Sequence, residues 1–331
     1  MKTVRYGIVG ATGYGSNHAD AVAAIDGAEV VGGTARSEAS LASFEVDHDA
    51  TGYTDYEDLF DAEPLDAVSI CTPSGTHAEI AVAAADAGLH VLSEKPLDVY
   101  LERVDRMIDA ADRNDVRLGG VFQRRFTPER WTARQWVEEG RFGDLLLADT
   151  AVKWHRPQRY YDDHWHGRRD LDGGVLMQQA IHFVDLLQWL TGGIERVTAD
   201  TGTMAHEMEC EDVAVVTVRF ENGARGTIEA TTGVSGGRER VELNGTAGSY
   251  NSGTFVLEDE AVDPDLTEPP YGTGLEGQIG DFVAAIREER DPIVSGRDAR
   301  EAVEVVLAAY ASAVLDRPVC IDEVRDVQAH T

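Results

Sequence analysis

Lysine is scarce in this sequence, although charged residues are abundant. Only three of the 29 basic residues are lysines (Lys2, Lys95 and Lys153), whereas the acidic residues number 60 and the formal net charge is −31. So negative a protein is repelled by nucleic acids and by anionic membrane surfaces, which argues against both as partners. Acid-rich, lysine-poor surfaces are typical of salt-saturated cytoplasms, where the Debye length is about 3 Å or less. The composition predicts a halophile, with an ordinary acidic cytosolic protein as the alternative.

Cysteines and long apolar runs are also rare. Cys71, Cys210 and Cys320 are odd in number, far apart and without metal-ligand spacing, so we expect neither a disulfide framework nor a zinc module. No apolar run approaches the roughly 18 residues of a membrane-spanning helix, and no signal-peptide pattern is seen. We therefore expect a cytoplasmic protein. A chain of 331 residues, 43% of them hydrophobic, is long enough for two domains.

The first part of the sequence alternates short β-rich runs with helical stretches. Strands are expected at residues 4–9, 29–34, 67–71, 90–93 and 117–122, and helices at residues 17–25, 76–87 and 101–112. Such alternation predicts right-handed βαβ units and a parallel sheet. A glycine-rich turn, G-A-T-G-Y-G, follows the first strand and precedes a helix N-terminus. Free N–H groups at that end of a helix suit a pyrophosphate.

The glycine turn departs from the usual dinucleotide-binding pattern. In G-x-G-x-x-G the middle position is glycine, whereas here Thr12 lies between Gly10 and Gly15. The βαβ context still favours a cofactor site, with contacts from Gly10, Thr12, Gly13, Tyr14 and Gly15. A tight turn that binds no ligand is the alternative interpretation.

The end of the second strand indicates which dinucleotide is bound. NAD sites usually place an acid there for the ribose 2′-hydroxyl, but residues 34–37 read T-A-R-S and the first acid is Glu38. Arg36 and Ser37 suit a 2′-phosphate, so NADP(H) is predicted in preference to NAD(H). If Arg36 only stacks on the adenine, either cofactor would fit.

Three segments further along the chain form a combined pattern. They read C-T-P-S-G-T-H at residues 71–77, E-K-P at 94–96 and G-G-V-L-M-Q-Q-A-I-H-F-V-D at 173–185. With these segments the chain resembles the glucose–fructose oxidoreductase/inositol dehydrogenase (Gfo/Idh/MocA) family over nearly its whole length. The resemblance implies an NAD(P)-dependent oxidoreductase. Such an enzyme transfers a hydride between the nicotinamide and a hydroxyl-bearing carbon of a sugar, sugar acid, polyol or nucleotide-sugar.

The resemblance also implies two domains. A Rossmann domain with a parallel sheet (residues 1–122) would precede an α+β substrate-binding and oligomerisation domain with a large, mostly antiparallel, open-faced sheet (residues 123–331). The sequence agrees, because β-rich runs occur at residues 145–153, 197–203, 213–220 and 224–232, with Asn222-Gly223 as a hairpin signal. The C-terminal helix could pack back on the first domain. An open sheet offers a flat face for another subunit, so a homodimer or homotetramer is expected.

Catalysis is assigned by the same resemblance to Lys95 and His182. In this family the lysine of E-K-P and the histidine of the G-G helix flank the substrate hydroxyl beside the nicotinamide. We expect His182 to take the hydroxyl proton and Lys95 to stabilise the developing negative charge. A surface lysine and a buried core histidine are the alternatives. Further cofactor contacts are expected from Thr72, Pro73, His77, Glu94 and Gln123.

Gln178 departs from the family pattern. Many family dehydrogenases carry an aspartate four residues before the histidine, one helical turn away on the same face. Glutamine can hydrogen-bond a sugar hydroxyl but cannot act as a base or hold a negative charge. We therefore predict Gln178 as a substrate-binding residue and leave the proton transfer to His182 and Lys95.

Aromatic and hydrogen-bonding residues are dense between residues 154 and 167. Sugar rings stack on aromatic side chains and their hydroxyls need partners, so Trp154, Tyr160 and Trp165 are predicted to bind substrate. An acidic sugar would need a cation, for which Arg125 is predicted and Arg156, Arg168 and Arg169 are further candidates. A structured loop without a ligand is the alternative.

A metal site is not expected in this segment. The residues that could converge on one are His155, Asp162, Asp163, His164, His166 and His182, but no second-site spacing supports zinc.

Two functions other than a dehydrogenase remain open. One is transient oxidation that enables elimination or glycoside hydrolysis, and the other is a cofactor-binding regulator without catalysis. A semialdehyde dehydrogenase is excluded, because no cysteine has the setting of a nucleophile.

Overall fold

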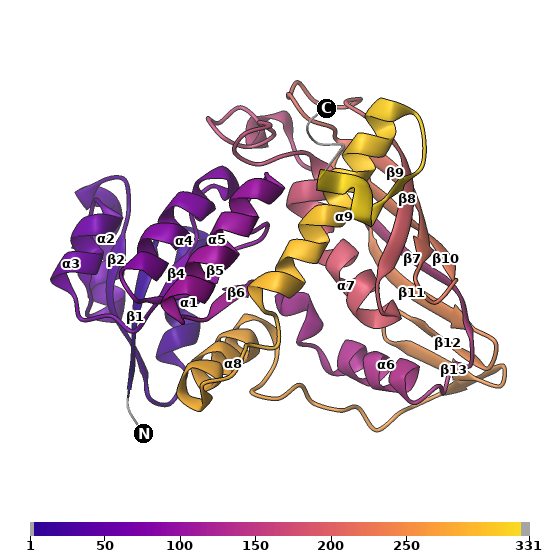
Figure 1. The fold of residues 1–331 in the computed structure, drawn as a ribbon, viewed down its shortest axis with the longest axis horizontal. Coiled ribbons are helices and arrows are strands. Elements are labelled where there is room, and N and C mark those ends of the chain that lie inside the picture. Colours follow the sequence, from indigo (N-terminus) through magenta and orange to yellow (C-terminus); the bar gives the residue numbers. More distant parts are fainter. Residues whose placement is uncertain (1–2, 326–331) are drawn as a thin grey trace. The chain divides into compact units, whose positions relative to one another are not determined.

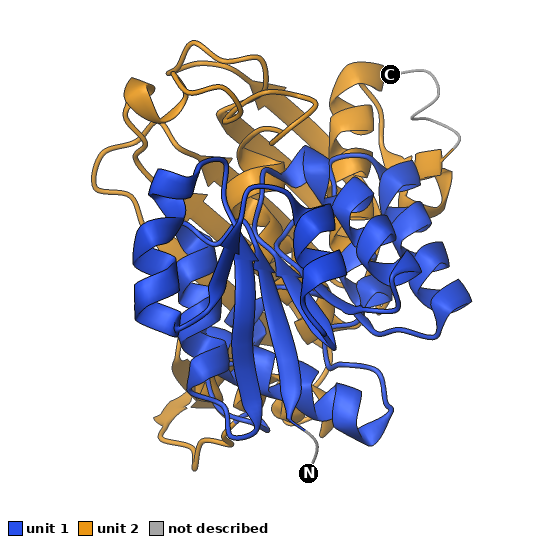
Figure 2. Cartoon of the chain, turned by 90° about the vertical axis from the view of Figure 1, so that its left-hand side faces the viewer, with its two compact units in different colours: residues 1–126, 269–300 blue, residues 127–268, 301–331 orange. Residues whose placement is uncertain are grey.

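Two β-sheets organise this chain, one in each of two units. The computed structural model describes residues 3–325. Unit 1 contains the residues up to Phe126 together with Pro269–Arg300, and unit 2 contains Thr127–Glu268 and the residues from Glu301 onward (Figure 2). Our predicted second domain, residues 123–331, includes Pro269–Arg300, which pack with unit 1 instead. The chain thus crosses between the units three times.

The sheet of unit 1 is parallel and six-stranded. Its strands are β1 (Val4–Val9), β2 (Ala28–Thr34), β3 (Thr51–Tyr53), β4 (Ala67–Ile70), β5 (His90–Ser93) and β6 (Leu118–Gly120). Their order is β3-β2-β1-β4-β5-β6, so the direction of winding reverses between β1 and β4. In open α/β sheets, ligands bind beyond the carboxyl ends of the strands at such a reversal.

Helices cover this sheet, and those within the first 126 residues also connect its strands. They are α1 (Tyr14–Ala23), α2 (Glu38–His48), α3 (Tyr56–Ala62), α4 (His77–Asp86), α5 (Leu101–Asn114) and α8 (Gly274–Glu288). Helix α8 lies beside α1 (Figure 1), and its Ile279, Phe282 and Val283 join Ala19 and Val22 of α1 in one buried cluster. Helix α1 begins at Tyr14, directly after the glycine turn and three residues before the predicted start at residue 17.

Unit 2 contains a nine-stranded sheet. Its strands are β7 (Leu145–Lys153), β8 (Ile194–Gly202), β9 (Val213–Phe220), β10 (Arg225–Thr231), β11 (Glu239–Gly245), β12 (Gly248–Asn251), β13 (Thr254–Leu257), β14 (Glu260–Val262) and β15 (Val319–Cys320). They follow the order β14-β13-β12-β11-β7-β10-β9-β8-β15, and every neighbouring pair except β7 and β10 is antiparallel. The predicted fold class, a Rossmann domain followed by a mostly antiparallel sheet, is confirmed.

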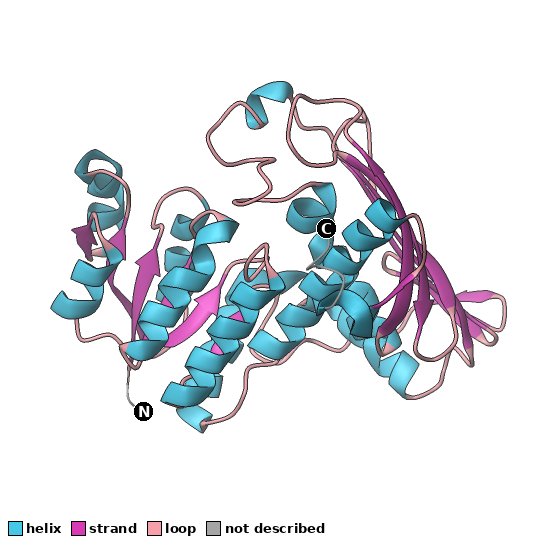
Figure 3. Cartoon of the chain, turned by 45° about the horizontal axis from the view of Figure 1, so that its top comes forward, coloured by secondary structure: helices cyan, strands magenta, loops and turns pink. Residues whose placement is uncertain are grey.

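One face of this sheet is covered by helices. Helix α6 (Pro128–Glu138), helix α7 (Ile181–Thr191) and the second half of α9 (Gly296–Leu315) lie against it (Figure 3). Strand β9 shows the resulting alternation, because Ala214 and Val216 are buried whereas Val215 between them is 49% exposed. Within residues 3–325, no helix is both long and apolar enough to cross a membrane.

Candidate active site

The glycine turn after β1 has a backbone that only glycine allows at two positions. Gly10 has a φ of +87°, and a Cβ there would lie 2.8 Å from the carbonyl oxygen of Cys71. A Cβ on Gly15 would lie 2.0 Å from the carbonyl oxygen of Gly10. Gly13 precedes α1 without a side-chain cap, and the first turn of α1 as described (Tyr14–Ala23) carries no acidic residue. The N-terminal end of this helix, with its dipole and no acidic residue beside it, therefore fits the pyrophosphate of a dinucleotide.

The same turn is tied to the end of β2, where the predicted 2′-phosphate residues follow. The amides of Gly10 and Ala11 donate to the carbonyl oxygen of Thr34 at 3.2 and 2.7 Å. Arg36 and Ser37 come next and are both exposed. Ser37 is the residue before α2, and its Oγ lies 2.8 Å from Oγ of Ser40. This placement puts both residues at the carboxyl edge of the sheet, where a bound adenosine ribose would lie.

Tyr14 and Gln123 are brought together although they are far apart in the sequence. The Gln123 Nε2 donates to the Tyr14 hydroxyl at 2.8 Å. Burial, reinforced by the negative charge of Glu94, raises the pKa of Tyr14 to about 12. The hydroxyl is therefore neutral at physiological pH and can both donate and accept a hydrogen bond. Both are predicted cofactor contacts, and they meet at the start of α1.

Lys95 follows β5 in a turn that a buried carboxylate holds in place. Glu94 is only 8% exposed, and its Oε2 accepts a hydrogen bond of 3.1 Å from the Lys95 amide. Its Oε1 lies 3.0 Å from Nε2 of His18, whose Nδ1 lies 3.0 Å from Oγ of Ser69. His18 is fully buried and links α1 to β4 and β5. No local pattern predicts this role, because the partners of His18 are distant along the chain.

His77 fixes the same turn from the opposite side. Its Nδ1 lies 2.9 Å from the carbonyl oxygen of Pro96, and its Nε2 lies 2.8 Å from the carbonyl oxygen of Thr72. The ring therefore joins the backbone that follows β4 to the turn that carries Lys95. Of the predicted cofactor contacts, His77 and Glu94 bond this turn directly, and Thr72 bonds His77.

Arg125 also belongs to unit 1. It lies in the short 3₁₀ turn Gln123–Arg125 and is only 4% exposed. An arginine so deeply buried is uncommon, because its charge must be compensated.

His182 and Gln178 lie in unit 2, on a helical segment that is not regular. A π-helical turn, Leu176–Ala180, runs directly into α7, so Gln178 lies in the π turn and His182 in the α-helix. Such a turn changes the alignment that a four-residue spacing has in a regular α-helix, and π turns are frequent at functional sites. Both side chains are largely buried, at 9% and 8% exposure. We name residues 176–191 the His182 helix.

A buried carboxylate accompanies Gln178. The Gln178 Nε2 donates a hydrogen bond to Oδ1 of Asp172, and Oδ2 of Asp172 accepts one of 2.7 Å from the amide of Gly167. Asp172 is only 1% exposed. Many family dehydrogenases carry an aspartate at the position of Gln178. Here the carboxylate comes from Asp172 instead and contacts the Gln178 side chain directly.

The predicted aromatic residues form one cluster in unit 2. Centroid distances of 3.9 and 3.6 Å separate the ring of His166 from those of Tyr160 and Trp165. The guanidinium of Arg156 lies 5.3 Å from the ring centroids of both Trp154 and Tyr160. We name residues 154–167 the aromatic segment. It brings a cation and flat apolar faces together, as binding of an acidic sugar requires.

Arg168 and Arg169 lie outside this cluster. Both are exposed, and Glu209 is their shared neighbour, since it lies 3.7 Å from Arg168 and accepts a hydrogen bond from the Arg169 amide. His166 is hydrogen-bonded to Asp163, and the amides of Trp165 and His166 also donate to that carboxylate. Over residues 3–325, no three His, Cys, Asp or Glu side chains converge as metal ligands.

The chain is similar to known proteins over nearly its whole length. Residues 4–121 match the model of the oxidoreductase family with an NAD-binding Rossmann fold (GFO/IDH/MocA), and residues 131–251 match the GFO/IDH/MocA C-terminal domain. Myo-inositol 2-dehydrogenase of Thermotoga maritima is 30% identical over 97% of this chain and 99% of that protein. The 2,7-anhydro-N-acetylneuraminate hydratase of Mediterraneibacter gnavus is 28% identical over 84% of this chain and 79% of that protein.

A solved structure with the same fold extends this comparison. The WlbA dehydrogenase from Bordetella pertussis, in complex with NADH and UDP-GlcNAcA, is 32% identical to this chain. The match covers 96% of this chain and 99% of that one, with a TM-score of 0.87.

Proposed function

The chain belongs to the Gfo/Idh/MocA family of oxidoreductases, and we propose that Lys95 and His182 are the two residues that handle the substrate proton. As a member of that family it is an NAD(P)-dependent dehydrogenase acting on CH–OH groups. Its relatives include dehydrogenases named for carbohydrate-type substrates, such as an inositol. The residues that perform the reaction in this chain, the cofactor it prefers and the substrate it takes are the proposals that follow.

The two residues have different tasks in the proposed mechanism. A bound nicotinamide supplies the hydride chemistry. The neutral imidazole of His182 takes the proton from the substrate hydroxyl. The ammonium of Lys95 hydrogen-bonds the same oxygen and stabilises the negative charge that develops on it. Glu94 and His77 hold the turn that carries Lys95, so the ammonium reaches the oxygen without a further rearrangement.

The observation that carries this proposal is the bracing of the Lys95 turn. A carboxylate fixes the lysine amide from one side, and His77 fixes the carbonyl of Pro96 from the other. Both bracing side chains are buried, whereas Lys95 itself is only half buried. A surface lysine needs no such support. In a chain with three lysines in all, this placement favours a role for the ammonium in catalysis.

Substitution of Lys95 tests the assignment. Lys95→Arg keeps the positive charge but replaces a compact ammonium by a planar guanidinium, so kcat/KM should fall by about 100-fold or more. Lys153→Arg is the matched control, because Lys153 forms an ion pair with Glu229 on the sheet and should tolerate the exchange. Circular dichroism establishes that both variants fold. A Lys95→Arg enzyme within a few fold of wild type would refute the proposal.

A double-mutant cycle tests whether the two residues share one hydroxyl. Groups that act as a unit show strongly non-additive effects, so Lys95→Ala combined with His182→Ala should cost little more than the worse single variant. Full additivity of the two losses would mean that they act in separate steps.

We also propose that NADP(H) is preferred over NAD(H). Arg36 and Ser37 support this choice, because both are exposed just beyond β2 and neither is an acid. The NADH in the WlbA complex belongs to that protein, so the ratio of kcat/KM values for the two cofactors must be measured here. Arg36→Ala should lower kcat/KM for NADP+ and leave that for NAD+ within a few fold. A wild-type preference for NAD+ would overturn the proposal.

For the substrate we propose an acidic sugar, free or nucleotide-linked. Arg156 lies against Trp154 and Tyr160, so a carboxylate and a sugar ring could be bound within one cluster. UDP-GlcNAcA in the WlbA complex supports this class. A screen of uronates against their parent aldoses and of nucleotide-linked against free sugars, at high salt, identifies the substrate. A clear preference for neutral polyols would exclude the acidic class.

A second candidate function is redox-neutral chemistry by transient oxidation. The observation that favours it is the relative named as a hydratase, since hydration involves no net oxidation. The two candidates differ in one measurement. Absorbance at 340 nm rises with turnover in a dehydrogenase, whereas a redox-neutral reaction forms product without accumulation of free reduced cofactor.

We further propose a homodimer or homotetramer that pairs through the outer face of the unit 2 sheet. Val215 and Leu147, at 49% and 48% exposure, lie on strands of this face together with the ion pair of Lys153 and Glu229. Light scattering should give a mass of two or four chains, and Val215→Glu should lower it. A monomeric wild type would exclude the proposal.

A further inference from the structure

Two adjacent carboxylates precede strand β9 in unit 2 and contact different parts of the unit. Glu211 is 8% exposed and Asp212 is fully buried. Buried carboxylates are costly unless their oxygens accept hydrogen bonds, so the partners of each one show what it stabilises. The partners of Glu211 lie at the start of the His182 helix, and those of Asp212 lie in the loop at residues 203–206.

Glu211 binds the first amides of the His182 helix. Its backbone carbonyl accepts from the Val175 amide and its Oε1 accepts from the Leu176 amide, both at 2.9 Å. The first amides of a helix have no partner within the helix, and a carboxylate there also interacts favourably with the helix dipole. Glu211 thus caps this helix from a distant position in the sequence.

The approach of Glu211 is fixed by two further residues. The Tyr310 hydroxyl donates to Oε1 of Glu211 at 2.9 Å and accepts from the Gly174 amide at 3.3 Å. A Cβ on Gly174 would lie 1.8 Å from Oε2 of Glu211, so only glycine leaves room for the carboxylate. This contact explains why the second residue of the G-G pair, Gly174, is a glycine.

Asp212 organises the loop at residues 203–206. Its Oδ1 accepts from the Met204 amide at 2.7 Å, and its Oδ2 accepts from the amides of Ala205 and His206 at 2.8 Å. The same Oδ2 also lies 2.8 Å from Nδ1 of His206. These hydrogen bonds lower the pKa of Asp212 although burial alone would raise it.

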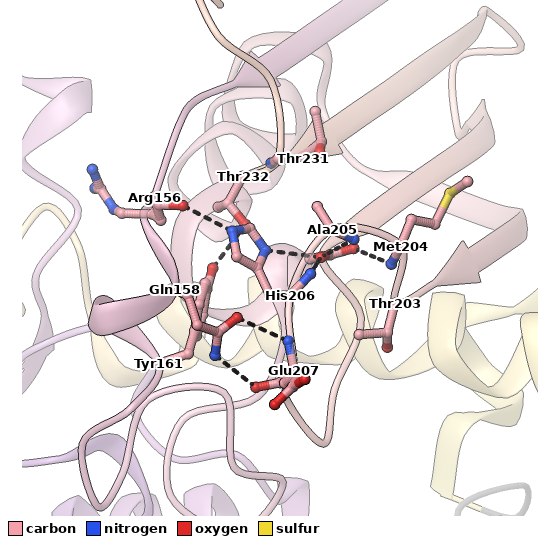
Figure 4. Close-up of polar contacts among 12 residues, drawn as sticks. Arg156, Gln158, Tyr161, Thr203, Met204, Ala205, His206, Glu207, Thr231 and Thr232 are labelled. Atoms are coloured by element: carbon pink, nitrogen blue, oxygen red, sulfur yellow. Dashed lines mark hydrogen bonds and ion pairs between the residues drawn. The ribbon is translucent and has the colours of Figure 1, made fainter.

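His206 connects the loop at residues 203–206 to the aromatic segment. Its Nε2 lies 2.8 Å from the carbonyl oxygen of Arg156, and its ring packs against Tyr161 with a centroid distance of 4.7 Å (Figure 4). The ring therefore lies between the Asp212 carboxylate and the Arg156 carbonyl and contacts each through one nitrogen. A second connection joins Gln158 to the backbone of Glu207. The Glu207 amide donates to Oε1 of Gln158 at 2.9 Å, and Nε2 of Gln158 donates to the Glu207 carbonyl oxygen at 3.1 Å.

We propose that Glu211 and Asp212 are positioning residues that hold the two substrate-side segments of unit 2, the His182 helix and the aromatic segment, at one fixed spacing. This inference rests on the proposed function of those segments. Because the two residues are consecutive and directly precede β9, which pairs with β8 and β10, a shift of one segment relative to the other would have to distort the start of β9 or break a buried hydrogen bond.

The proposal assigns different kinetic effects to the two carboxylates. Glu211→Gln weakens the cap of the His182 helix, so kcat should fall about 10-fold with KM nearly unchanged. Asp212→Asn removes the carboxylate that holds the loop amides and the His206 ring, and so loosens the contact of that ring with the Arg156 carbonyl. KM should therefore rise about 10-fold with a smaller change in kcat. Glu207→Gln is the matched control, because it neutralises an exposed carboxylate next to the loop. The bonds of Glu207 to Gln158 are made by its backbone and are kept, so this variant should behave as wild type.

Hydrogen exchange of the full-length variants gives a readout that does not depend on turnover. In Glu211→Gln, exchange should accelerate at residues 175–180 and not at 154–158, whereas Asp212→Asn should show the reverse. If either variant fails to fold, Tyr310→Phe and His206→Asn remove one hydrogen-bond partner each and should show the same patterns more weakly. Exchange and kinetics equal to those of Glu207→Gln in both variants would overturn the proposal.

The two levels of inference can be told apart. If wild-type protein transfers no hydride with any carbohydrate, the proposed function fails, yet the exchange patterns still show whether the two carboxylates hold their segments. If wild type is active and the exchange patterns are absent, the positioning role fails alone.

Discussion

Glu211 and Asp212 are neighbours in the chain but differ in protonation, because they differ in the number of N–H groups they face. Burial raises the pKa of Glu211 to about 7, against the effect of the Leu176 amide and the Tyr310 hydroxyl. Asp212 is bonded by three amides and the His206 ring, and these hydrogen bonds lower its pKa although burial would raise it. Desolvation dominates at the first residue and hydrogen bonding at the second.

The raised pKa of Glu211 predicts a pH-dependent stability. The unfolded carboxyl ionises above its ordinary pKa of 4.5, whereas the folded one keeps its proton up to about pH 7. The folded state therefore loses stability as pH rises from about 4.5 to 7, by on the order of 3 kcal/mol from this group. Glu211→Gln cannot ionise and should lack this loss.

Urea unfolding of wild type and Glu211→Gln at pH 5 and pH 8 measures the effect. The difference in the free energy of unfolding between the two proteins should change between these pH values in favour of the variant. Glu207→Gln controls for the removal of one negative charge. An unchanged difference would mean that Glu211 ionises in the folded protein as it does in the unfolded one.

The sequence reveals buried histidines less well than it reveals motif residues. His77 could be predicted because it belongs to the C-T-P-S-G-T-H pattern, but His18 and His206 could not. His18 bonds Ser69 and Glu94, which are 51 and 76 residues away, and His206 bonds the Arg156 carbonyl, 50 residues away. The hydrogen-bond partners of a buried histidine depend on how distant segments pack. The spacing of residues near it in the sequence does not predict those partners.

At the scale of elements, Gly174 lies where the start of the His182 helix meets the carboxylate that precedes β9. Gly174→Ala should destabilise the protein by about 1–3 kcal/mol, because the new methyl group would displace the Glu211 carboxylate. Gly202→Ala is a suitable control, since a Cβ there lies 3.7 Å from its nearest neighbour and the backbone is not left-handed. Thermal unfolding compares the two. Equal stability of both variants would show that the carboxylate can move aside without cost.

The strands of unit 1 could be predicted well, and α8 could not be assigned. Short apolar runs between glycine turns and helical stretches located β1, β2, β4 and β5 within about a residue, because a parallel sheet is buried on both faces. The apolar residues Ile279, Phe282 and Val283 indicate that α8 is buried. They do not indicate that it is buried against α1, and the π turn before α7 likewise has no sequence signature.

At the scale of the whole molecule, the charge of −31 predicts that salt stabilises the fold. Self-repulsion at neutral pH weakens as the Debye length shrinks to about 3 Å at 1 M salt, so the urea midpoint at pH 7 should rise with KCl concentration. The control is the same titration near pH 4.5, the sequence isoelectric point, where little net charge remains to be screened. An equal rise at both pH values would mean that salt acts through the solvation of apolar surface instead.

The three crossings of the chain between its units bear on how such proteins can recombine. A chimera of two relatives joined once, after Phe126, would combine the α1 of one parent with the α8 of the other. Ile279, Phe282 and Val283 would then have to fit a core for which they were not selected. A chimera that preserves unit 1 must take both of its segments, the N-terminal one and Pro269–Arg300, from the same parent. These segments are separate in the gene, so a single crossover cannot exchange them together. The two units are therefore inherited together more readily than the order of the sequence implies.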